Sequence, residues 1–269
     1  MEIIGYTAAI FIGVLLGLIG GGGSILTVPV LVYLFKIDPI IATAYSLFII
    51  GTTSVVGVIP KYKQGLVHMK TAVIFGIPSI ITVFVTRKYL IPLIPENILE
   101  IGDFTITKAI LTMIVFAILM IAASISMIKK SKNNISELNQ NQIFNYPLII
   151  IEGTIVGLLT GFVGAGGGFI IIPALVILSK LPMKMAIGTS LLIIASKSLI
   201  GFLGDISTQS YNSTMEWDFL LIFTSLSIIG IFIGNFYSKK VDGEKLKKGF
   251  GYFVLIMGVY IIWNELFNK

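Results

Sequence analysis

Long apolar runs separated by short polar stretches are the dominant pattern of this chain. The runs cover residues 3–19, 24–35, 39–59, 71–86, 106–128, 147–163, 168–179, 184–204, 216–237 and 249–267. About 20 apolar residues cross a hydrocarbon core of ~30 Å as one helix, so runs of this kind predict membrane-spanning helices. Strands of a membrane barrel would instead alternate apolar and polar residues over about 10 positions. The pattern therefore predicts an all-α, polytopic integral membrane protein.

The composition of the chain agrees with a bilayer as its solvent. Hydrophobic residues make up 56% of the 269 residues, charged residues only 12%, and the mean hydropathy is +0.99. Soluble domains carry about 25% charged residues, which excludes a soluble enzyme, a nucleic-acid binder and a disordered protein. With no cysteine and a single histidine, His68, we predict no metal site, no cofactor and no catalytic residue. We expect His68 to be a solvated loop residue.

Two of the apolar runs are short, and each follows a cluster of glycines. The first cluster covers residues 20–23 and the second covers residues 164–168. Each pair of runs joined through glycine spans about 33 residues, which as one straight helix would measure about 50 Å. That length exceeds the ~30 Å hydrocarbon core, so we predict a broken helix or a re-entrant hairpin with glycine at its tip.

The two halves of the chain repeat each other. Aligning residues 17–57 with 161–201, an offset of 144 residues, gives 16 identities in 41 positions. Ten of the identities involve residues other than Leu, Ile and Val: Gly17, Gly20, Gly22, Gly23, Pro29, Lys36, Ala42, Ser46, Ser54 and Gly57. We predict two repeats, 1–128 and 147–269, joined by a polar linker at 129–146. Each repeat would hold one glycine-broken pair and three further transmembrane helices.

The distribution of basic residues predicts how the repeats are oriented. If each broken pair returns to its own side, 13 lysines fall on the face formed by residues 60–70, 129–146, 180–184 and 238–248. Only five basic residues fall on the opposite face, so the positive-inside rule makes the lysine-rich face and the linker cytoplasmic. We therefore predict inverted repeats in the cell membrane with both termini outside. A single crossing by each broken pair would separate the lysines of 239–248 from Lys129–Lys132, which the rule disfavours.

The glycine tips are the first candidates for binding chemistry. A tip followed by a short helix presents N–H groups at the positive end of a helix dipole, and this arrangement binds anions. We expect the short helices to begin near Ser24 and Gly168. Close helix packing is the other role for glycine in membranes, and we favour it for the isolated Gly13, Gly230 and Gly258.

Lys197 is the second candidate, because it is a full charge inside an apolar run. Its repeat counterpart is the neutral Thr53, so the predicted site is asymmetric. Snorkelling or pairing with Glu152 are the alternatives for Lys197, and a bond to the i−4 carbonyl is the alternative for the helix hydroxyls. The predicted substrate-binding residues are Gly20, Gly21, Gly22, Gly23, Ser24, Ser46, Thr53, Gly164, Gly166, Gly167, Gly168, Thr189, Ser190 and Lys197.

At these residues the chain resembles the sulfite exporter TauE/SafE family of bacterial and archaeal membrane transporters. The features that carry the resemblance are the segments 17–23 and 161–167, Pro29 and Pro173, and the segments 42–46 and 186–190. The resemblance covers essentially the whole chain. It implies export of sulfite or of a related sulfur-containing or organic acid anion. Tyr45 stands where the second half has Thr189. This difference argues against an equal contribution of the two halves to the binding site.

Several properties stay open at this stage. An anion channel built from the same tips, an intramembrane enzyme and a membrane scaffold are the alternatives to an alternating-access transporter. The predicted partners are a small anionic substrate and the lipid bilayer, with no nucleic acid. Whether the protein forms a homo-oligomer, and whether H⁺ or Na⁺ acts as a coupling ion, is not determined by the sequence.

The orientation can be tested with single cysteines in this cysteine-free chain. Cysteines placed at Asn134 and Asn212 should react with a membrane-impermeant maleimide from opposite sides of the membrane, because the basic asymmetry puts these positions on opposite faces. The measurement is labelling of intact cells against labelling of inverted vesicles. Reaction of both cysteines from the same side would contradict the inverted-repeat topology.

Overall fold

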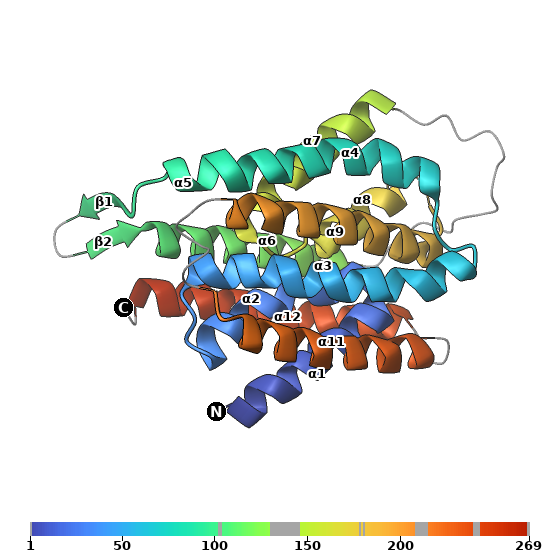
Figure 1. Ribbon diagram of the computed structural model, residues 1–269, viewed down its shortest axis with the longest axis horizontal. Helices are drawn as coiled ribbons and strands as arrows, with labels where there is room; N and C mark the ends of the chain where they lie inside the picture. The colour runs from blue at the N-terminus through green and yellow to red at the C-terminus, as the bar shows by residue number, and fades with distance from the viewer. Residues whose placement is uncertain are drawn as a thin grey trace.

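The computed structural model describes residues 2–101, 104–129, 146–177, 179, 181–207, 215–238 and 243–267. Within these residues seven helices are long and apolar enough to cross a membrane, which confirms the predicted helical membrane fold (Figure 1). Residues 130–145 of the predicted linker, which include Asn134, lie outside the described residues, and so does Asn212. The elements in chain order are α1 (Glu2–Ile19), η1 (Gly20–Leu26), α2 (Thr27–Pro29), η2 (Val30–Leu34), α3 (Pro39–Lys63), α4 (Met69–Val85), η3 (Thr86–Leu90), α5 (Ile91–Leu93), β1 (Asn97–Ile101), β2 (Phe104–Thr107), α6 (Lys108–Ile128), α7 (Tyr146–Val163), α8 (Gly168–Ile177), α9 (Met183–Ile206), α11 (Trp217–Tyr237) and α12 (Gly243–Phe267).

The first glycine cluster turns the chain back on itself. Gly20 has a φ of +73°, a conformation that residues with a Cβ rarely adopt, and α1 ends there. The ring of Phe35 lies 5.4 Å from the ring of Tyr6, so the chain returns to the end at which α1 begins. This half of the chain therefore contains a re-entrant hairpin. The expected helix start near Ser24 is wrong, because the 3₁₀ segment η1 already begins at Gly20 and the hydroxyl of Ser24 donates to the carbonyl of Gly21.

The second glycine cluster makes a sharper turn between α7 and α8. Gly164, Gly166 and Gly167 have φ values of +71°, +63° and +69°, so three residues of the turn adopt the left-handed conformation. The short helix α8 then begins at Gly168, as the sequence predicted. In both hairpins the first arm is longer than the second. Figure 1 shows α7 and α9 beginning at the same end of the molecule, so the chain returns through α8 to the end from which α7 came.

Helices α3 and α9 form an antiparallel pair at the centre of the molecule. Near one end, the guanidinium of Arg87 contacts both Thr43 at the start of α3 and Asp205 at the end of α9. Near the other end, the backbone N–H of His68 donates to Thr189 at the start of α9. His68 also caps α4, since its Nδ1 accepts from the N–H of Thr71, and its half-buried side chain differs from the solvated one expected.

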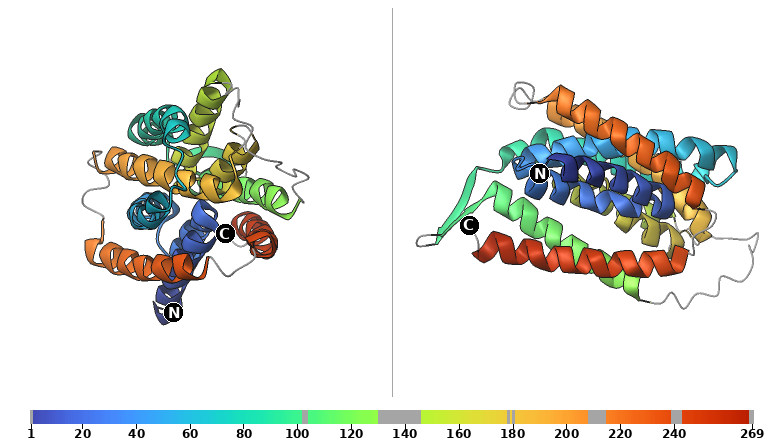
Figure 2. Two further views of the ribbon diagram at one scale, coloured as in Figure 1. Left: turned by 90° about the vertical axis from the view of Figure 1, so that its right-hand side faces the viewer. Right: turned by 90° about the horizontal axis from the view of Figure 1, so that it is seen from below.

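The outer helices pack on this pair in a pattern that is unchanged when the two halves are exchanged. The repeat makes α7 the counterpart of α1, α11 the counterpart of α4, and α12 the counterpart of α6. Helix α1 packs on α11, and in the same way α7 packs on α4. Helix α6 packs on its own counterpart, α12 (Figure 2). Two repeats related by a two-fold axis would produce this pattern. The orientation of the molecule in a membrane stays a prediction.

The segment after α4 continues the helix beyond the apolar run 71–86 from which the sequence predicts it. The helix continues through η3 and α5 to Leu93, and the side chain of Arg87 is fully buried. Strands β1 and β2 follow as an antiparallel hairpin in which Ile101 pairs with Phe104 and Asn97 with Thr107. Because Arg87 and Lys88 interrupt the apolar run, the sequence alone ended the helix too early.

Glycines allow the outer helices to approach closely. A Cβ atom on Gly17 of α1 would lie 2.6 Å from the backbone nitrogen of Asn235, and one on Gly153 of α7 would lie 2.6 Å from the carbonyl oxygen of Phe75. Gly13 and Gly230 contact each other's helices in the same way, and Gly258 packs on α6, which confirms the packing role favoured for these glycines.

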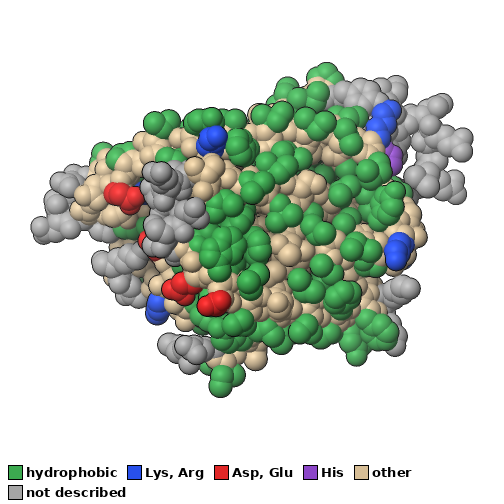
Figure 3. Space-filling model, in the orientation of Figure 1, with side chains coloured by type: hydrophobic (Ala, Val, Ile, Leu, Met, Phe, Trp, Pro, Cys, Tyr) green, Lys and Arg blue, Asp and Glu red, His purple; other side chains and the backbone are tan. Residues whose placement is uncertain are grey.

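The surface is mostly apolar between two charged ends. On the face shown in Figure 3, hydrophobic side chains cover the middle, and the visible acidic side chains gather at one end. Many large hydrophobic side chains are exposed along the outer helices, as is expected of side chains that contact lipid.

A bulky residue at Gly153 should destabilise the fold. Gly153→Leu would force α7 away from α4, and overpacking of this kind costs about 1–3 kcal/mol. The measurement is the thermal unfolding temperature of the detergent-solubilised protein. Gly249→Leu is the matched control, because Gly249 has open space around its Cβ position and should change the unfolding temperature little. Equal unfolding temperatures for both variants would contradict the packing role.

Candidate functional site

The two glycine tips contact each other through their backbones. A Cβ atom on Gly21 would lie 2.6 Å from the Cα atom of Gly168. Around this contact, Gly166 packs on the side chains of Ile50 and Ile194, which lie near the midpoints of α3 and α9. The tips therefore meet at the centre of the α3–α9 pair.

Each tip also extends past this centre. Gly20 packs on Ile187, seven residues or about two turns from Ile194 toward the start of α9. Gly164 packs on Thr43, the same distance from Ile50 toward the start of α3. Because α3 and α9 are antiparallel, the hairpins pass each other.

The surroundings of the two tips differ in chemistry although their glycines are repeated. The first tip contacts the apolar side chains of Leu15, Ile19, Met127 and Ile187. The second tip contacts polar and charged side chains: Thr43, Arg87, Thr160 and Lys197. The second tip is therefore the better candidate for binding a polar ligand.

Lys197 lies directly against the second tip. Its side chain is 1% exposed, and its Nζ donates to the hydroxyl of Thr160 over 2.7 Å. A Cβ atom on Gly167 would lie 2.9 Å from the same Nζ. No carboxylate pairs with Lys197 in the part of the chain that the structure describes. The alternatives of snorkelling and of pairing with Glu152 are thus not observed.

Several buried hydroxyls near the tips lack partners among the described residues. Ser46 and Thr53 are two of them, and both lie one turn from Ile50, on the face of α3 that packs on Gly166. Three further buried hydroxyls also lack a partner among the described residues: those of Thr27, Ser54 and Ser198.

Two other predicted residues have their hydroxyls engaged elsewhere. Ser190 donates to the carbonyl of Ile187, and Thr189 accepts from the N–H of His68 in the loop between α3 and α4. Thr189 therefore faces the loop rather than the tips.

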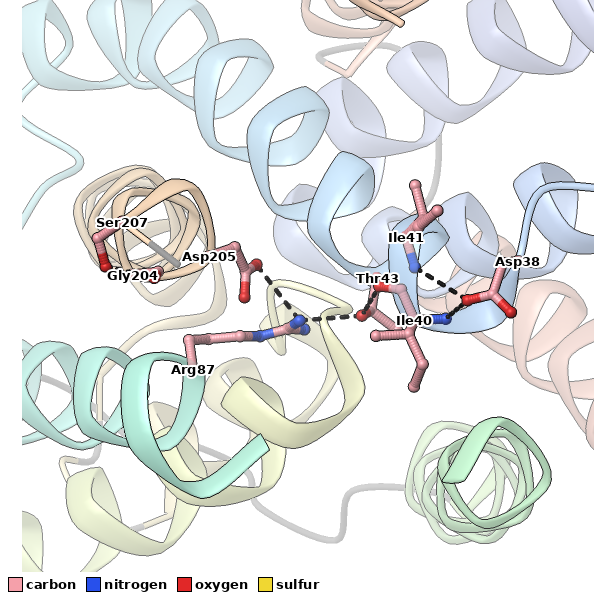
Figure 4. Close-up of polar contacts among 8 residues, drawn as sticks. All are labelled: Asp38, Ile40, Ile41, Thr43, Arg87, Gly204, Asp205 and Ser207. Carbon is pink, nitrogen blue, oxygen red and sulfur yellow. Dashed lines mark hydrogen bonds and ion pairs between the residues drawn. The ribbon is translucent and has the colours of Figure 1, made fainter. Parts of the chain in front are cut away.

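A buried ion pair at the far end of the second tip was not predicted from the sequence. Nη1 of Arg87 lies 3.3 Å from Oδ2 of Asp205 and donates to the hydroxyl of Thr43 over 2.9 Å (Figure 4). Arg87 and Asp205 are both fully buried. Gly201 and Gly204 of α9 leave room for the arginine stem, and their spacing before Asp205 was the only sequence signal.

The comparisons with known proteins agree with this architecture. Residues 6–261 match the family described as Sulfite exporter TauE/SafE. A protein of Xylella fastidiosa with the name "Probable membrane transporter protein" is 28% identical over 260 residues, which cover 94% of this chain and 92% of that protein. The similarly named YdhB of Bacillus subtilis is 27% identical over 256 residues, covering 94% of this chain and 96% of YdhB.

A relative from Methanocaldococcus jannaschii shows a similar degree of likeness. This relative is also named a "Probable membrane transporter protein" and is 25% identical over 261 residues, which cover 93% of this chain and 91% of the relative. No solved structure matches the chain. The family match spans both glycine tips and all seven long helices, and the chain is a multi-pass membrane protein that belongs to the sulfite exporter TauE/SafE family.

Proposed function

We propose that this membrane transporter carries small anions and binds them at the second glycine tip. The observation that carries the proposal is the buried ammonium of Lys197, which contacts Gly167 and has only the hydroxyl of Thr160 as a described partner. A buried cation without a counter-ion is costly, so an anion from solution would stabilise it.

The backbone of the second tip supports the same conclusion. Helix α8 is 10 residues long and begins at Gly168; the N–H groups of Ile170 and Ile171 donate to the carbonyl of Gly167, which leaves those of Gly168 and Phe169 without a partner within the helix. These groups and the positive end of the helix dipole favour negative charge. Gly166 and Gly167 carry no side chain that would keep a ligand away from this backbone.

An oxyanion of sulfur fits this set of donors. Sulfite and related anions present several oxygen atoms on one centre, each of which accepts hydrogen bonds from amide, hydroxyl and ammonium groups. The family description names sulfite, and we propose sulfite or a similar sulfur-containing or organic acid anion as the substrate. Ser46 and Thr53 are the hydroxyls best placed to complete the shell.

Alternating access is the mechanism we favour over a channel. The tips are in backbone contact at Gly21 and Gly168, so they block a straight path between the two hairpins. Movement of one hairpin and its packed helices against the other would expose the site to each side in turn. Export follows from energetics, because a membrane that is negative inside drives an anion outward by about 2.3 kcal/mol per charge per 100 mV.

The test is transport of sulfite by purified protein in proteoliposomes with an imposed potassium-diffusion potential. Flux should saturate with concentration and leave the negative compartment. Lys197→Ala should raise KM about 10- to 100-fold, because a hydrogen bond to a charged group contributes about 1.5–3 kcal/mol.

Lys63→Ala is the matched control for the lysine variant, since Lys63 is exposed and its removal also takes away one positive charge. Unsaturable flux would favour a channel. The absence of flux for sulfite, sulfate, thiosulfate and small sulfonates would favour an enzyme or a scaffold. An unchanged KM for Lys197→Ala would contradict the proposed site.

The two tips should respond differently to the same substitution at equivalent positions. Gly166→Ala should reduce transport at least ten-fold, because its φ is +63° and a Cβ atom would lie 2.7 Å from the side chain of Ile50. Gly22→Ala should keep most of the activity, because the nearest atom to its Cβ position is 3.1 Å away in the side chain of Ile19. Uptake rates corrected for the amount of folded protein are the measurement. Equal losses would contradict an asymmetric site.

A further inference from the structure

Arg87 has more hydrogen-bond donors than partners. A guanidinium has five N–H groups, and the two on Nη1 are occupied by Thr43 and Asp205. Nε and Nη2 have no partner among the described residues, although both atoms are buried. Three of the five donors are therefore unused in a site that is shielded from solvent, where an unpaired polar group is costly.

The unused donors form one edge of the guanidinium. The N–H groups of Nε and Nη2 point in parallel, and this fork matches two oxygen atoms of one anion. The edge lies against the second tip, since a Cβ atom on Gly164 would be 2.5 Å from Nη2. Figure 4 shows the guanidinium of Arg87 reaching toward Thr43 and Asp205, and its Nη1 makes both contacts.

The ion pair with Asp205 holds the side chain of Arg87 in place but uses only one of its hydrogen-bond donors. The Nη1–Oδ2 distance of 3.3 Å is long for a charge-assisted bond, which is usually about 2.7–2.9 Å. Oδ1 of Asp205 has no partner among the described residues. A bidentate pair would have used two donors of the arginine for the aspartate, whereas the observed contact uses one.

We propose that Arg87 is a second anion-binding residue, which receives the anion from Lys197 through its Nε–Nη2 edge. Asp205 is a positioning residue that orients this edge and weakens the hold of Arg87 on the anion. The inference rests on the proposed function and names the next binding position on the same tip.

The placement of the two cations defines a path. Lys197 contacts the tip at Gly167 and Arg87 contacts it at Gly164, while Lys197 and Asp205 are eight residues or about 12 Å apart along α9. An anion that leaves Lys197 therefore meets Arg87 before it reaches that end of the molecule. The carboxylate of Asp205 lowers the positive potential at Arg87, so the anion is released rather than trapped.

The opposite end of the molecule does not offer the same pair. The 144-residue offset places Lys61 at the position equivalent to Asp205, and Nζ of Lys61 donates to the hydroxyl of Ser238 over 3.3 Å. The two ends thus differ in charge at equivalent positions.

The test is radiolabelled sulfite transport by the full-length protein, with KM and kcat measured separately. Arg87→Gln should raise KM at least ten-fold. Arg87→Lys, which keeps the charge but loses the fork, should raise KM by a smaller factor. Asp205→Asn should lower KM several-fold and also lower kcat, because the anion is then held more tightly and released more slowly.

A purely structural ion pair predicts a different result. In that case Arg87→Gln and Asp205→Asn would both lower the unfolding temperature and leave KM for sulfite unchanged, and this outcome would overturn the proposal. Sulfite transport that depends on Lys197 but not on Arg87 would overturn this inference alone. Failure of the unsubstituted protein to transport or bind sulfite would overturn the proposed function for sulfite together with this inference. Lys63→Ala is again the control for loss of one exposed positive charge.

Discussion

The contact between the two glycine tips is the constraint on which the rest of the structure depends. Turn backbone within a membrane protein is tolerated only where other protein groups bury it. Here each tip is buried by the other, with Gly21 against Gly168, and by α3 and α9 on either side. The glycine-lined contacts of α1 with α11 and of α4 with α7 then hold the first arm of each hairpin in place. Side chains at these glycines would separate the tips and expose unpaired backbone groups.

A repeated frame carries an asymmetric site. The offset of 144 residues pairs Thr160 with Leu16, Lys197 with Thr53, and Thr43 with Ile187. Thr160, Lys197 and Thr43 contact the second tip, whereas Leu16 and Ile187 contact the first tip. The first hairpin thus supplies an apolar wall, and the second supplies the charges. The carrier of one small anion proposed above needs only one such cluster, so the repeat of the backbone does not require a repeat of the chemistry.

The two buried cations of the second tip are stabilised in different ways. Lys197 has a hydroxyl partner and no described carboxylate, whereas Arg87 has a carboxylate partner that uses one of its five donors. Burying an ion is unfavourable unless its charge is balanced and its donors are paired. The region around the tip therefore holds one lysine without a described carboxylate partner and several unpaired donors, and both features favour an anionic ligand with more than one oxygen atom.

The sequence by itself determined the membrane class, the two breaks at glycine, the repeat and the unusual position of Lys197. These follow from local properties: the length of apolar runs, the need for glycine at positive φ, and the cost of a charge within an apolar segment. Only the tertiary structure decided which tip is polar, because that depends on which side chains of α3, η3, α7 and α9 reach Gly164 and Gly167. Arg87 and Asp205 could not be recognised from the sequence for the same reason. Each looked like a charge at a helix end, 118 residues from the other, and only the packing of η3 on α9 buries and pairs them.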